Sequence, residues 1–196
     1  MDLYQRVVQH FHGGVDDMLQ AADLLAAGII DVATRMANCL LQDGKILTLG
    51  EGSAGLLAQH FTNTLMHRYR RERPGLPAVT VASDVSLLTA IATETHYNEV
   101  FARQIRALGQ PGDLLLIICG SHASGAILQA IQAAHDRELI TVAIGPSNCG
   151  DLAALLTSDD AILQVPATDP ARIIELDLLC LHALSDLIDC QLFGGD

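Results

Sequence analysis

Residues 113–131 read DLLLIICGSHASGAILQAI, and this stretch decides the fold class. The uninterrupted apolar run at 114–119 is typical of a strand that is buried on both faces of a parallel sheet. Small polar residues follow, and a helical pattern then begins. A strand, a tight turn and a helix N-terminus in this order direct several backbone N–H groups to one spot, where phosphate or another small oxyanion can bind. The hydroxyls of Ser121 and Ser124 can converge there, although Ser124 can equally be an ordinary helix cap.

The rest of the chain repeats this alternation of strand and helix. Further apolar runs of strand length occur at 45–49, 77–82, 140–144 and 161–165. Helical patterns lie between and around them at 54–67, 84–108, 124–136 and 150–156. Strands that alternate with helices predict a parallel sheet with right-handed crossovers and helices on both faces. In such sheets, ligands bind at the carboxyl ends of the strands, where the strand order reverses.

Helices are also expected at both ends of the chain. Residues 2–43 are helical in period, with a break predicted at Gly13-Gly14 or at Gly28. Residues 171–192 form a long helix that Asp169 caps and that is apolar almost all round, as expected for a helix in an oligomer interface. We therefore predict a single α/β domain over 1–196, with an N-terminal helical segment (1–43) before the α/β core and terminal helix (44–196).

The bulk composition restricts the class of protein. Of the 196 residues, half are apolar and only 17% are charged, which favours a homo-oligomer that hides additional surface. The net charge of −12 argues against direct binding to nucleic acid. No secretory signal and no apolar run of about 20 residues is apparent, so we expect no membrane segment. The five scattered cysteines suit a reducing cytoplasm.

Two groups of residues are candidates for a functional site. The turn Gly50-Glu51-Gly52-Ser53 resembles a dinucleotide fingerprint, but Glu51 would place a carboxylate in the anion site, so we interpret the glycines as tight-turn residues. His60 and His182 become interesting only if their helices meet, and otherwise they are ordinary packed histidines. No ligand spacing of a known metal motif accompanies them.

Many short motifs make the chain similar to the sugar isomerase (SIS) domain family. It resembles the branch that holds phosphoheptose isomerase and the DnaA-initiator-associating protein. The motifs cover nearly the whole chain and include Gly50–Gly52, Gln59-His60-Phe61, Arg73-Pro74-Gly75-Leu76-Pro77-Ala78, Asn98-Glu99-Val100-Phe101, Pro111-Gly112-Asp113, Ala171-Arg172-Ile173 and Asp186-Leu187-Ile188-Asp189. The resemblance implies a flavodoxin-like five-stranded sheet sandwiched by helices, in a homotetramer with sites between subunits.

The resemblance also implies a set of site residues. A sugar phosphate would be bound by Gly52, Ser53, Ser121, Ser124, Arg68 and Glu94. His182 and His60 would be catalytic if the protein is active, and they are weak candidates for a metal site. Zinc is then expected only if isomerase activity is retained, and otherwise no cofactor is expected.

Two departures from the family pattern lead to the main functional prediction. The isomerases' helix glutamate falls on Thr64, and their terminal-helix glutamine falls on Ile174. Because proton transfer between C1 and C2 needs a positioned acid and base, we predict a non-catalytic tetramer with a degenerate phosphosugar site. It would bind the DnaA initiator through Leu192 and Phe193. The alternative is a phosphoheptose isomerase, or a phosphosugar-binding regulator, with an altered site.

Overall fold

The computed structural model describes residues 2–147 and 149–195. They form one five-stranded sheet with helices around it. The strands are β1 (Ile46–Gly50), β2 (Ala78–Thr80), β3 (Leu114–Ile118), β4 (Ile140–Pro146) and β5 (Ala161–Val165). Neighbouring strands are all parallel, in the order β2-β1-β3-β4-β5. The predicted α/β class is confirmed, and this order is the flavodoxin-like one.

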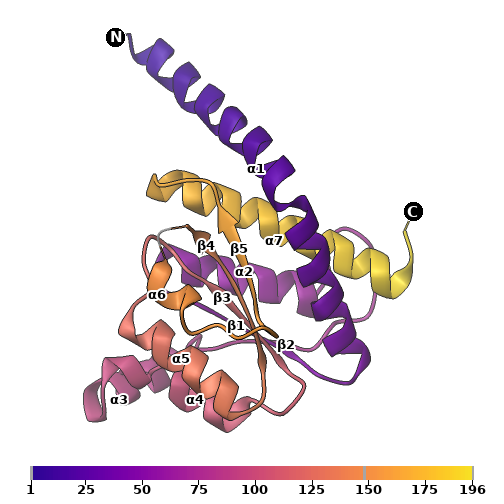
Figure 1. The fold of residues 1–196 in the computed structure, drawn as a ribbon, viewed down its shortest axis with the longest axis vertical. Helices are drawn as coiled ribbons and strands as arrows, with labels where there is room; N and C mark the ends of the chain where they lie inside the picture. Colours follow the sequence, from indigo (N-terminus) through magenta and orange to yellow (C-terminus); the bar gives the residue numbers. More distant parts are fainter. Residues whose placement is uncertain (1, 148, 196) are drawn as a thin grey trace.

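Helices cover both faces of the sheet, as Figure 1 shows. They are α1 (Leu3–Leu41), α2 (Ser53–Met66), α3 (Val85–Glu94), the 3-10 helix η1 (Tyr97–Glu99), α4 (Ala102–Leu108), α5 (Gly125–Asp136), α6 (Gly150–Ala153) and α7 (Pro170–Phe193). One apolar core lies between the sheet and α1, α2 and α7, and a second lies under α4 and α5. Leu114, Leu116 and Ile118 of β3 enter the first core, while Leu115 and Ile117 enter the second. Burial on both faces explains why this strand is an unbroken apolar run.

The N-terminal segment differs from the prediction, because α1 is a single helix of 39 residues without a break. Its glycines allow close packing instead. A Cβ at Gly14 would lie 2.5 Å from Nη1 of Arg172, and one at Gly28 would lie 2.8 Å from Cδ2 of Leu163. The predicted helix at 84–108 is also interrupted, since α3 ends at Glu94 and is followed by η1 and α4.

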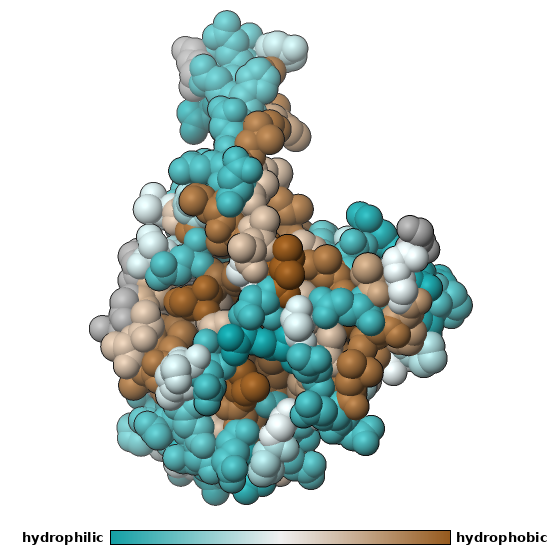
Figure 2. Space-filling view, turned by 45° about the vertical axis from the view of Figure 1, so that its right-hand side comes forward, coloured by the Kyte–Doolittle hydropathy of each residue, from teal (hydrophilic) through white to brown (hydrophobic). Residues whose placement is uncertain are grey.

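The N-terminal end of α1 projects beyond the rest of the molecule (Figures 1 and 2), and Arg172 of α7 contacts it at His10 and Asp17. Leu3, Tyr4 and Phe11 are at least 70% exposed there. By length and composition, α1 is the one helix among the described residues that could cross a bilayer, which the sequence analysis did not anticipate. This is weak evidence of a membrane segment, since its second half packs against α7 and β5 as a core helix does.

Two features of the core matter for stability. Arg73 is buried and its Nε donates to Oδ1 of Asp189 at 2.7 Å, while its Nη groups donate to the carbonyls of Thr64 and Leu65. Asp177 of α7 is fully buried, and both of its carboxyl oxygens lack a hydrogen-bond partner among the described residues. The first feature is a buried ion pair in which Oδ2 of Asp189 has no hydrogen-bond partner among the described residues, whereas the second is a buried carboxyl group with no partner at all.

Candidate functional site

The turns that follow β1 and β3 meet at the carboxyl edge of the sheet. Gly50 and Ile118, the last residues of these strands, are register partners. In this topology β1 and β3 flank the switch point, where α/β sheets bind their ligands. A cavity of about 570 Å³ opens there. Its lining includes Glu51, Ser53, Gly120, Ser121, Ile174 and Glu175.

The first turn brings the N-terminus of α2 to this cavity. A Cβ at Gly50 would lie 2.6 Å from the carbonyl of Ala54, so the turn can close this tightly only with glycine. Gly52 has a φ of 57°, a backbone conformation that glycine adopts without strain. Ser53 then begins α2 and lines the cavity. The structure thus agrees with the interpretation of this segment as a tight turn, and Gly52 shapes it.

The second turn brings the N-terminus of α5 to the same edge. Ser121 lines the cavity, and its hydroxyl lies 3.3 Å from Nδ1 of His122. Ser124 is the N-cap of α5, and its Oγ accepts a hydrogen bond from the backbone N–H of Ile127 at 3.3 Å. Of the two hydroxyls proposed for an anion, Ser121 therefore faces the cavity and Ser124 acts as a helix cap.

Two carboxylates line the cavity, and they have different environments. Oε1 of Glu51 accepts a hydrogen bond from the Tyr97 hydroxyl at 3.0 Å. Burial of Tyr97, together with this hydrogen bond and the charge of Glu51, raises the pKa of the phenol. Glu175 instead pairs with Arg172, whose Nη1 lies 2.5 Å from its Oε2. The sequence analysis missed Tyr97 and Glu175, because their positions depend on how η1 and α7 pack.

His60 of α2 and His182 of α7 meet, which the sequence left open. Their Nε2 atoms are 3.0 Å apart, and the ring of Tyr69 lies 5.6 Å from that of His182. Partial burial, and then the positive charges of His60 and Arg70, lower the pKa of His182. His182 is thus neutral at neutral pH. The cavity and the histidine pair both lie between α2 and α7. His60 is seven residues after Ser53, so it lies about 10 Å further along α2 at about 1.5 Å per residue.

The residues around this pair do not fit a zinc site. Catalytic zinc requires three protein ligands, and the histidines supply two. One turn further along α2, the hydroxyl of Thr64 contacts Oγ of Ser185 at 2.9 Å, and Ile174 is aliphatic. Among the described residues, no cluster of three or more His, Cys, Asp or Glu side chains could hold a metal.

Four other predicted site residues lie outside the cavity. Arg68 pairs with Glu72 on the surface, and Glu94 lines a separate cavity between α3 and α4. Leu192 and Phe193 are both half-buried, and Leu192 packs against the first core. The guanidinium of Arg73 lies 6.0 Å from the Phe193 ring. Leu192 and Phe193 are therefore mainly helix-end packing residues rather than an exposed pair.

A parallel sheet of this order with a cavity at its switch point is the arrangement in which α/β proteins bind small ligands. A family model described as SIS domain matches residues 10–145, and the chain belongs to this family. It is 47% identical over its full length to proteins named phosphoheptose isomerase from Chromohalobacter salexigens and Halorhodospira halophila, of which it covers 99% and 98%. The phosphoheptose isomerase structure from Francisella tularensis superimposes with a TM-score of 0.92 at 36% identity, covering 96% of this chain and 99% of that one.

These comparisons correct the main functional prediction. The expectation of a non-catalytic protein that binds the DnaA initiator is wrong, because four relatives that match at 44–47% identity over nearly the whole chain are named phosphoheptose isomerase. The structure of phosphoheptose isomerase from Neisseria gonorrhoeae, at a TM-score of 0.90, points the same way. The error came from treating Thr64 and Ile174 as decisive, while the histidine pair was left open.

Proposed function

We propose that this protein is a phosphoheptose isomerase, which interconverts the ketose and aldose forms of a seven-carbon sugar phosphate such as sedoheptulose phosphate. The observation that carries this proposal is the 3.0 Å contact between His60 and His182 beside the switch-point cavity. The names of the full-length relatives support the same activity.

The layout of the site suits an extended sugar phosphate. The phosphate would lie at the N-termini of α2 and α5, where backbone N–H groups and the hydroxyls of Ser53 and Ser121 can donate to it. The histidine pair lies about 10 Å further along α2, which is comparable to the length of an extended seven-carbon chain. C1 and C2 would then lie beside the histidines.

Isomerisation moves a proton between C1 and C2 through an enediol, so it needs one group that accepts a proton and one that donates it. The Nε2 atoms of the two rings lie 3.0 Å apart, so one ring donates a hydrogen bond and the other accepts it, and the pair presents both functions. His182, with its lowered pKa, is the better candidate for the base. His60 would donate to the sugar oxygen that gains a proton. This assignment needs no carboxylate at position 64.

A coupled assay with sedoheptulose phosphate tests this proposal. The wild type should turn over, and His182→Gln should lose at least about 100-fold in kcat, as expected for loss of a general acid–base group. His12→Gln is a matched control, because His12 lies on the exposed half of α1. The proposal is refuted if the wild type shows no turnover above buffer, or if His182→Gln and His12→Gln are equally active.

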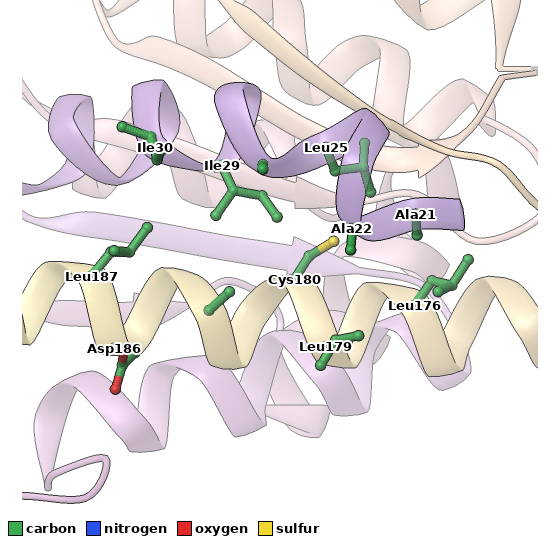
Figure 3. A pocket seen from close by; sticks show the side chains of 12 residues that line it. Ala21, Ala22, Leu25, Ile29, Ile30, Leu176, Leu179, Cys180, Asp186 and Leu187 are labelled. Atoms are coloured by element: carbon green, nitrogen blue, oxygen red, sulfur yellow. The ribbon is translucent and has the colours of Figure 1, made fainter. Parts of the chain in front are cut away.

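We also propose that the protein is a homotetramer. The apolar stripe of α1 that packs on α7 continues onto the exposed half of the helix at Leu3, Val7, Phe11 and Met18. A groove of about 420 Å³ lies between α1 and α7, as Figure 3 shows; it is lined by apolar side chains that include Leu25, Ile29, Leu176, Leu179 and Leu187. Helices of a second copy would cover this surface, since exposed apolar patches of this kind mark interaction sites.

The free cysteines of the protein favour a reducing cytoplasm as its location.

A further inference from the structure

We propose that Glu51 makes this site select phosphate esters of polyhydroxylated sugars over inorganic phosphate. Its carboxylate would repel a bare phosphate, and it would accept hydrogen bonds from the hydroxyls of a sugar. The inference rests on the proposed function, because it concerns the same cavity.

The repulsion follows from the position of Glu51. Glu51 lines the cavity together with Ser53 and Ser121, whose hydroxyls are available to an anion. Its negative charge also reaches the base of the second turn. Cys119, which directly precedes Gly120, lies at this position. The pKa of its thiol is raised mainly by burial and by the neighbouring Cys149 thiol, and more weakly by the charges of Asp177 and Glu51. A phosphate dianion bound between the turns would therefore lie in the field of this carboxylate.

The charge of Glu51 is not balanced by a cation, unlike that of Glu175. Glu175 pairs with Arg172, which also lies 3.6 Å from Asp17. The only hydrogen bond to Glu51 found among the described side chains comes from the neutral hydroxyl of Tyr97. Glu51 thus has no cationic partner among the described residues, and the hydrogen bond from Tyr97 holds its side chain in place.

A sugar chain compensates for the repulsion, whereas inorganic phosphate does not. An ionised carboxylate accepts hydrogen bonds and donates none, and Oε2 of Glu51 is free of partners among the described residues. Sugar hydroxyls are donors, and hydrogen bonds to a charged acceptor are about twice as strong as neutral ones. The hydrogen bonds from a sugar to Glu51 therefore offset the binding free energy that its phosphate loses by repulsion. Inorganic phosphate makes no such hydrogen bonds and binds weakly.

The test measures the affinity of two ligands by calorimetry at fixed ionic strength. The ligands are inorganic phosphate and sedoheptulose phosphate, and the proteins are the wild type, Glu51→Gln and Glu175→Gln. We expect Glu51→Gln to bind inorganic phosphate about tenfold more tightly, because a repulsion between nearby charges is removed. The same variant should not bind the sugar phosphate more tightly, so the preference for the ester falls about tenfold or more.

The Glu175→Gln control and one further variant, Glu51→Asp, make the result specific. Glu175→Gln leaves Arg172 without this partner, so it should strengthen the binding of both ligands, whereas Glu51→Gln should strengthen only the binding of inorganic phosphate. Glu51→Asp keeps the charge and should keep the rejection of inorganic phosphate. Raising the salt concentration should narrow the difference between wild type and Glu51→Gln, since the repulsion is screened.

The inference is overturned if Glu51→Gln leaves both affinities unchanged or strengthens both equally, and also if no protein binds either ligand. Its failure is distinguishable from that of the proposed function. Turnover in the coupled assay with no selectivity change in Glu51→Gln refutes the inference alone. Selective binding without turnover refutes the isomerase alone.

Discussion

Replacing Asp177 with asparagine should change how the stability of the protein depends on pH. Asp177 is fully buried and its carboxyl oxygens have no partner among the described residues. Burial raises the pKa of this carboxyl from 3.8 to about 7. The folded state therefore keeps a proton that the unfolded chain releases above pH 4. The contribution of Asp177 to folding stability is therefore most favourable at low pH. It is lost progressively as the pH rises from the unfolded pKa of 3.8 through the folded pKa of about 7.

The size of the effect follows from the shift. A difference of about three pKa units corresponds to a destabilisation of about 4 kcal/mol once the pH is above both values. Between pH 5 and pH 8, the free energy of unfolding of the wild type should fall by about 2.5 kcal/mol, since the rest of the loss has already occurred by pH 5. Asparagine has nearly the same shape and does not titrate, so the variant should not show this loss.

Urea unfolding of wild type and Asp177→Asn at pH 5 and pH 8, at one protein concentration, measures the difference directly. Other titrating groups contribute equally to both proteins and cancel in the comparison. The variant should gain about 2 to 3 kcal/mol on the wild type between the two pH values. A stability difference that is constant within about 0.5 kcal/mol from pH 5 to pH 8 would refute the reasoning, because Asp177 would then have an ordinary pKa in the folded protein.

Three further predictions follow from the packing and the surface. Light scattering at micromolar concentration should give about four times 20.9 kDa, and a monomer would contradict the oligomer proposal. Arg73→Met should destabilise the protein by about 3–5 kcal/mol in urea unfolding, because it leaves Asp189 buried without its partner; a loss below about 1 kcal/mol would mean that Asp189 is solvated. Gly50→Ala should cost about 1–3 kcal/mol and weaken binding of sugar phosphate, since the new Cβ would collide with the carbonyl of Ala54; unchanged binding would mean that the turn adapts.

Much of the fold could be predicted from local pattern. The apolar run at 114–119 predicts a strand, and the structure has one at Leu114–Ile118, because burial on both faces produces an unbroken apolar run between clear turn residues. The capping of α7 by Asp169 was also predictable, and its carboxylate accepts from the N–H groups of Ala171 and Arg172. The break in α1 was predicted wrongly. Glycine lowers helix propensity, but at Gly14 and Gly28 close packing outweighs that cost.

The site was predictable only in part. The turns at Gly52 and Ser121 could be placed at one edge because parallel strands end at the same side of a sheet. The meeting of His60 and His182 could not be predicted, since no sequence spacing reports the distance between two helices that are 122 positions apart. Arg68 and Glu94 were assigned to the site on the family resemblance, and within one chain Arg68 pairs with Glu72 and Glu94 lines a separate cavity.

The continuous form of α1 limits how this protein can change in length. Its residues advance by about 100° of rotation each, so the exposed stripe that includes Leu3 and Phe11 keeps its angular phase with the buried stripe that includes Leu25 and Met36. Inserting one residue near Gly14 would turn the outer stripe by about 100° relative to the inner one. Inserting seven would turn it by only about 20°. Relatives that keep the same assembly should therefore differ in α1 by whole pairs of turns, or at the end of the helix, and not by single residues in its middle.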